Sequence, residues 1–142
     1  MAKWTMDLNK YVKDKQTEIK EVRKAYAFAL YSSIVKKTPV DTGRARANWN
    51  VSVGSPDLST SENTRKTPKS KKEMPEPKGD ESIFISNNLP YITTLEYGGY
   101  PKNSTTGKTV NGFSKQAPEG MVGVTLANND AIFDSAVRSV KK

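Results

Sequence analysis

The chain has 142 residues, a net charge of +8 and a pI near 9.6, with 35% hydrophobic and 27% charged residues, so we expect a single domain over residues 1–142. Without cysteine it has no disulfide framework and no thiolate metal site, and without histidine it lacks the commonest general base and metal ligand. No apolar run suits a signal peptide or a membrane helix, so we expect cytosolic synthesis and no membrane contact.

Apolar spacing predicts one long helix over residues 5–37. Its apolar residues recur at steps of three and four: Leu8, Val12, Ile19, Val22, Tyr26, Ala29, Leu30 and Ile34. Residues 25–35 are denser in large apolar side chains, so we expect them to be the buried part. The first half is poorer in them, and it is predicted either to fray in isolation or to reach toward a neighbouring subunit.

A tight turn is predicted directly after this helix. Pro39 cannot continue a helix and moves Thr38 out of the α region. Asp41 and Thr42 have short side chains that can bond the backbone, and Gly43 tolerates a positive φ. The residues from Thr38 to Gly43 therefore separate the helix from the next element.

Strict alternation then predicts a half-buried strand over residues 44–53. One face carries Ala45, Ala47, Trp49, Val51 and Val53, and the other carries Arg44, Arg46, Asn48, Asn50 and Ser52. The polar face suits either a wet contact with protein or nucleic acid or a plain solvated sheet surface. On charge pattern alone the solvated surface is favoured.

Residues 56–80 are predicted to form a flexible loop, because four prolines and few apolar residues cannot offset the entropy of ordering. Five positive charges stand close together there with no negative charge between them: Arg65, Lys66, Lys69, Lys71 and Lys72. They suit either a contact with nucleic acid or another anionic surface, or a solvated hairpin tip, and the tip is the commoner case.

The second half of the chain contributes shorter elements. We predict a strand at 82–86, a helix at 90–97 that ends at Gly98-Gly99, a loop at 99–115 and a C-terminal helix at 118–140. Together with the long helix they indicate an α+β fold, in which helices pack on a small, mainly antiparallel sheet.

The residues with catalytic potential do not assemble into a reaction centre. No nucleophile stands with a base, and the carboxylates lack the spacing of a metal site, so we expect no enzyme, no cofactor and no metal. Glu96 is the one carboxylate on an otherwise apolar short helix. A structural role, as a helix cap or as an ion-pair partner of Arg44 or Arg46, is favoured over catalysis.

Four segments of the chain resemble a known family. Residues 38–49 (TPVDTGRARANW) after a long helix look like the signature of neck proteins of tailed bacteriophages, the tail-completion or minor tail group of head–tail joining components. Residues 87–92 (NNLPYI), 95–98 (LEYG) and 116–122 (QAPEGMV) fit the same group. We call these four the motif segments, and the motif residues in the first of them are Thr38, Pro39, Asp41, Thr42, Gly43 and Trp49.

The resemblance implies a structural virion protein at the head–tail junction, assembled in the host cytoplasm. Members of the group form homo-oligomeric rings, typically hexameric, around the channel through which DNA leaves the head. The implied partners are further copies of the chain, the connector or adaptor of the head, the tail tube or terminator proteins, and packaged DNA through non-specific contacts. The candidate interface or lumen charges are then Arg44 and Arg46 together with the basic residues of 65–72.

Two other functions remain as alternatives. A small basic protein that binds nucleic acid without sequence preference would explain the charge, although no recognition helix or pattern of stacking aromatics is evident. A virion hydrolase is the enzymatic alternative, and the missing histidine and the missing carboxylate pair count against it.

Overall fold

The computed structural model describes residues 8–40, 43–102 and 107–140. They form the predicted α+β fold, with a long N-terminal helix, a C-terminal helix and a small antiparallel sheet. Asp41 and Thr42 of the predicted turn lie outside the described residues.

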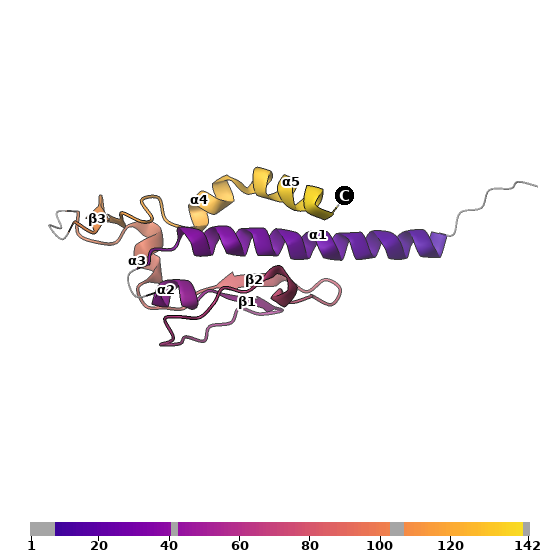
Figure 1. Ribbon diagram of the computed structural model, residues 1–142, viewed down its shortest axis with the longest axis horizontal. Helices are drawn as coiled ribbons and strands as arrows, with labels where there is room; N and C mark the ends of the chain where they lie inside the picture. The colour runs from indigo at the N-terminus through magenta and orange to yellow at the C-terminus, as the bar shows by residue number, and fades with distance from the viewer. Residues whose placement is uncertain (1–7, 41–42, 103–106, 141–142) are drawn as a thin grey trace, which may run out of the picture.

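Helix α1, Leu8–Lys37, is the central element and runs through most of the length of the molecule (Figure 1). On one side it is covered by α5, Asn129–Val140, and on the other by the sheet of β1, Asn50–Val53, and β2, Ile83–Ser86. The fold therefore has three layers, with α1 as the middle one.

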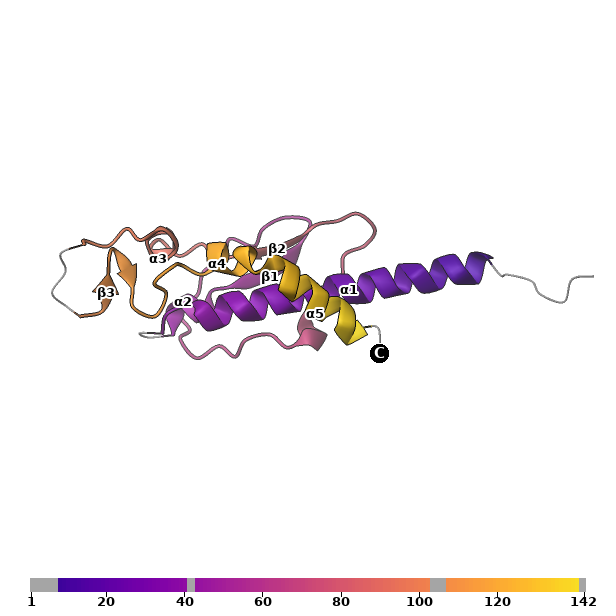
Figure 2. The same cartoon turned by 90° about the horizontal axis from the view of Figure 1, so that it is seen from above.

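The two halves of α1 differ as the sequence predicts. The second half holds every buried residue of the helix: Ala25, Ala27, Tyr31, Ile34 and Val35. Residues 8–17 are all exposed, and this end of α1 extends past the other elements in both views (Figures 1 and 2). The first half is thus a helix without a covering layer among the described residues.

The strand predicted over 44–53 is wrong in its first half. Arg44–Ala47 form a short helix, α2, and β1 begins only at Asn50. Alanine and arginine both favour a helix, and alternation over four residues fits one helical turn as well as a strand. Gly43 begins α2 at φ 91°, the positive φ predicted for it, and its carbonyl accepts a hydrogen bond from the Ala47 N–H.

The strand predicted at 82–86 is confirmed as β2. It pairs antiparallel with β1 in a register that sets Asn50 opposite Ser86 and Val53 opposite Ile83. Inner-face residues of the pair, Val51 among them, join the core. The connection between the strands is long, and it returns along the body of the molecule (Figure 2).

This connection is anchored, although its composition predicts a flexible loop. Met74 is 3% exposed and belongs to the core, where its burial contributes about 2 kcal/mol. A 3₁₀ turn, Lys71–Glu73, precedes it, and the Glu73 carboxylate accepts a hydrogen bond from the Ser70 N–H. Met74 thus helps to fix the segment, in which Pro77 is also buried.

Helix α3, Ile92–Tyr97, is the short helix predicted at 90–97, and Gly98 ends it in a left-handed conformation as expected. The following segment, predicted as a loop, contains a small hairpin of β3, Thr109–Val110, and β4, Phe113–Ser114. Its turn is formed by Asn111 and Gly112, both at positive φ, as a two-residue hairpin requires.

The helix predicted at 118–140 begins later and is interrupted. Residues 117–120 form a turn, α4 spans Val122–Ala127, and α5 follows after Asn128. Asparagine is a poor helix former, and its position at the junction fits the break. The core between the layers contains Tyr31, Ile34, Val35, Ala45, Trp49, Val51, Met74, Leu89, Leu95, Ala117 and Met121.

Candidate functional site

Thr38 is the centre of a buried hydrogen-bond cluster at the end of α1. Its hydroxyl donates to the Ile34 carbonyl at 2.7 Å and accepts from the Trp49 indole Nε1 at 2.8 Å. Thr38 is 1% exposed, and Trp49 is 5% exposed. Thr38 and Trp49 therefore tie the end of α1 to the start of the sheet.

Arg46 extends this cluster through contacts with the main chain. Its guanidinium donates from Nε to the Thr38 carbonyl at 2.8 Å and from a terminal nitrogen to the Lys36 carbonyl at 3.1 Å. Both carbonyls belong to the end of α1, where a positive charge is favourable. The role predicted for Arg46 at an interface or lumen stays a prediction.

Arg44 also has a partner within the chain. Its guanidinium forms a 2.8 Å ion pair with the exposed Glu62 carboxylate, on the long connection between the strands. Glu96, the carboxylate considered as a partner of either arginine, accepts hydrogen bonds from backbone N–H groups of residues 121–123. The two arginines hold the chain together locally.

Glu96 caps a helix, which is the other structural role predicted for it. Its two carboxylate oxygens accept hydrogen bonds from the N–H groups of Met121, Val122 and Gly123, all at 2.8 to 2.9 Å. These N–H groups open α4, where a negative charge is stabilised. The carboxylate on which the hydrolase alternative depends is thus fully engaged with backbone.

Three asparagines in or beside the β1–β2 sheet form contacts that the sequence does not indicate. The amides of Asn48, Asn50 and Asn88 donate to carbonyls of residues 57–61, at 2.9 to 3.4 Å. Asn48 also accepts from the Ser61 N–H at 2.7 Å. The beginning of the long connection is therefore fastened across the sheet by side-chain amides.

The basic residues of 65–72 lie on a segment held beside α1. The Lys69 N–H donates to the Tyr31 hydroxyl at 3.1 Å, while Arg65, Lys66, Lys71 and Lys72 are exposed. These five residues lie close together along one segment, the end of which includes the 3₁₀ turn Lys71–Glu73. We call residues 65–72 the basic strip.

Two carboxylates near the basic strip have lowered pKa values. The pKa of Asp57 lies below its ordinary value of 3.8 because the Ser59 hydroxyl and N–H donate to it, and because Lys66 and Lys69 are near. The pKa of Glu73 is lowered by hydrogen bonds from Ser70 and by the charge of Lys69. Both carboxylates stay ionised at neutral pH and partly offset the strip.

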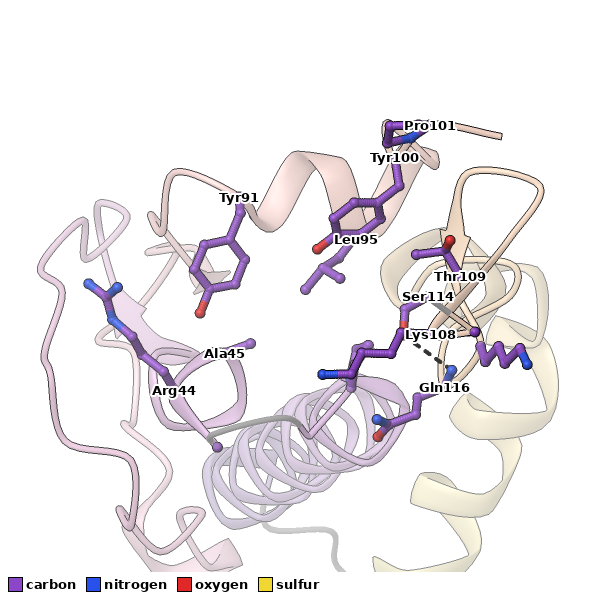
Figure 3. A pocket seen from close by; sticks show the side chains of 14 residues that line it. Arg44, Ala45, Tyr91, Leu95, Tyr100, Pro101, Lys108, Thr109, Ser114 and Gln116 are labelled. Carbon is purple, nitrogen blue, oxygen red and sulfur yellow. Dashed lines mark hydrogen bonds between the residues drawn. The ribbon is translucent and has the colours of Figure 1, made fainter. Parts of the chain in front are cut away.

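A cavity of about 910 Å³ opens where α2, α3 and the β3–β4 hairpin approach one another (Figure 3). The rings of Tyr91 and Tyr100 extend toward the hollow from opposite ends of α3, with Leu95 between them. Arg44, Lys108 and Lys115 add positive charge to the lining. Sequence reasoning missed this site, because its residues come from separate elements.

The described residues contain no group of histidine, cysteine, aspartate or glutamate that could hold a metal ion. None of the helices within the described ranges is both long and apolar enough to cross a membrane. Comparisons with protein-family models, with curated proteins and with solved structures find no match to this chain. The fold and the site define an α+β protein in which Thr38 and Trp49 bond to each other where α1 ends.

Proposed function

We propose that the chain is a structural protein of a tailed-bacteriophage neck, which forms a homo-oligomeric ring between the head connector and the tail, around the channel for DNA. The proposal assigns it no catalytic step. Its neighbours would be the connector or adaptor on the head side and the tail tube or terminator proteins on the tail side.

The observation that carries the proposal is the convergence of the four motif segments. Asn87 donates to the Ala45 carbonyl, Gln116 bonds both backbone groups of Val40, and Glu96 caps residues 121–123. Each contact joins two motif segments that are distant in sequence. The four motif segments, which were chosen for their resemblance to one family, therefore contact one another in the fold. This supports the proposal that they belong together as the signature of that family.

The shape of the molecule also supports a role in assembly. Each strand of the β1–β2 pair has a partner on one side only among the described residues, so both have an edge that can pair with another chain. The first half of α1 extends past the body, with apolar side chains in water. A closed ring needs two different complementary patches on each copy, and such features can supply them.

The mass of the purified protein in solution, followed by negative-stain imaging, tests this proposal. We expect closed rings with a central channel, either from the protein alone or after it is mixed with head or tail particles. A chain that stays monomeric under all these conditions would contradict the neck function.

The basic strip favours a second candidate, a sequence-independent nucleic-acid-binding protein. Five cations held on one segment can neutralise phosphates, and such binding weakens steeply with salt. A gel-shift titration of duplex DNA, with Lys66, Lys71 and Lys72 replaced by glutamine in the matched variant, separates the two. Tight binding by a stable monomer that is lost in the variant would favour this candidate over the ring.

A further inference from the structure

The first half of α1 carries an apolar stripe that no other part of the described chain covers. Leu8, Val12 and Ile19 are 64%, 50% and 59% exposed, and Tyr11 beside them is 52% exposed. Their spacing places them on one face of the helix. Lys15 lies on the same line between Val12 and Ile19 and gives the stripe one positive charge, which pairs with Glu18 at 3.4 Å within the helix.

This stripe continues the surface that α5 covers farther along the helix. Tyr26 and Ser33 follow Ile19 at heptad steps and so share its face. The Tyr26 hydroxyl bonds Asn129, and the Ser33 hydroxyl bonds Thr125 at 3.1 Å. Figure 2 shows α5 ending near the middle of α1. The face of α1 on which α5 packs therefore continues past the end of α5.

A second stripe, only partly covered, lies on α4 and α5 and crosses the break between them at Asn128. Leu126 is 54% exposed and Phe133 is 43% exposed, although the Phe133 ring meets Tyr26 edge-on. Val137 follows four residues later and is partly buried. Asp130 is exposed and lies between Leu126 and Phe133, so this stripe has one negative charge within it.

The two stripes are complementary when their helices run in opposite directions. Both have steps of four, three and four residues, and the lysine of one then meets the aspartate of the other. The matched pairs are Leu8 with Val137, Val12 with Phe133, Lys15 with Asp130 and Ile19 with Leu126. Antiparallel packing is also how α5 meets α1 within the chain (Figure 1).

We propose that the first half of α1 docks antiparallel on the α4–α5 flank of a second copy of this chain. Thr125 contacts Ser33, which lies 14 residues after Ile19, or about 21 Å along the helix, so Ile19 and Leu126 of one chain cannot meet. The contact joins different patches on the two copies, and it repeats from copy to copy. The inference rests on the proposed neck function. The docking would be the contact between neighbouring copies in the proposed ring.

Cysteine cross-linking tests the docking directly, because the chain has no cysteine of its own. In the full chain with Ile19→Cys and Leu126→Cys, we expect mild oxidation to give a ladder of disulfide-linked oligomers. Both sites are exposed, so the substitutions leave the core intact. The control pairs Leu126→Cys with Thr17→Cys, which lies on the opposite face of α1, and it should give no ladder.

Charge exchange tests the proposed register. Lys15→Glu and Asp130→Lys should each weaken self-association about tenfold, and the double variant should recover most of this loss. Lys13→Glu makes the same charge change on another face of α1 and should have little effect. Sedimentation at low salt measures these differences, because an exposed pair is screened as salt rises.

The results separate the docking from the neck function. Equal cross-linking in the Ile19 and Thr17 variants, or no rescue in the charge-exchanged double variant, would overturn the docking even if stained rings were seen. A specific ladder with rescue, but without closed rings, would support the docking and contradict the proposed ring. No ladder from the chain with Ile19→Cys and Leu126→Cys, together with a wild-type chain that stays monomeric in sedimentation, would overturn both.

Discussion

The Trp49 indole donates its N–H to the Thr38 hydroxyl, and the same hydroxyl donates to the Ile34 carbonyl one turn earlier in α1. One buried oxygen therefore connects the last turn of the long helix to the residue that leads into the sheet. Arg46 reinforces the junction by binding the Thr38 carbonyl. The end of α1 is fixed in this way by three side chains of the first motif segment.

Thr38→Val should destabilise the fold by about 2 kcal/mol, because it leaves the Trp49 N–H buried without an acceptor. Chemical denaturation followed by circular dichroism measures the loss. Thr38→Ser keeps the hydroxyl and should cost clearly less. Equal losses in the two variants would show that the methyl group matters more than the hydrogen bonds.

Gly43→Ala should destabilise the protein by about 2 kcal/mol, from left-handed strain and from displacement of the neighbouring chain. Gly43 has φ +91°, and a Cβ there would lie 2.4 Å from the Thr64 carbonyl oxygen. Gly79 has φ +65°, and a Cβ there would have no neighbour within 4 Å, so Gly79→Ala isolates the strain alone. Thermal unfolding should rank Gly43→Ala as the more harmful change, and equal losses would contradict the clash with Thr64.

Two substitutions of Glu96 should lower the free energy of unfolding by different amounts. Glu96→Gln keeps one acceptor oxygen but loses the charge at the start of α4, at a cost of about 1 kcal/mol. Glu96→Ala removes all three hydrogen bonds and should cost about 2 to 3 kcal/mol, as measured by urea denaturation. Glu119→Gln, an exposed carboxylate in the preceding turn, is the control. A Glu96→Ala protein as stable as the wild type would contradict the capping role.

Acid should destabilise the folded chain in part through Asp57 and Glu73. The pKa values of both carboxyl groups are lower in the folded chain than their ordinary values of 3.8 and 4.5. Their contribution to the free energy of unfolding is therefore complete above those ordinary values and is lost as the pH falls through the lowered ones. Asp57→Asn with Glu73→Gln should therefore reduce the pH dependence of stability below about pH 4.5. Denaturant titrations at several pH values measure this slope, and an unchanged slope would contradict the prediction.

The sequence predicts those parts of the fold that depend on one residue and its own backbone, such as the ends of helices. Pro39 ends α1 and Gly98 ends α3, because each acts through its own backbone. Residues 44–47 are wrongly predicted as strand, because an alternation of alanine and arginine over one turn has no unique period. The Asn111-Gly112 hairpin has the expected turn residues, but its strands are only two residues long and give almost no pattern.

Contacts between distant segments account for what the sequence could not show. The burial of Met74 depends on core residues from several other elements. Glu96 is expected to cap a helix or to pair with an arginine, and only the fold reveals that its donors lie 25 to 27 residues away. The cavity beside Tyr91 and Tyr100 arises in the same way, from three elements that meet only in space.

The asparagine contacts across the sheet recognise only main-chain groups of the segment that they hold. Asn88 bonds the Leu58 carbonyl and Asn50 the Ser59 carbonyl, while the side chain of Leu58 is 60% exposed. Attachment of this kind is indifferent to the identity of the residues attached. The outer surface at 57–61 can therefore change its chemical character by substitution, and so adapt to a new neighbour, while its path across the molecule stays the same.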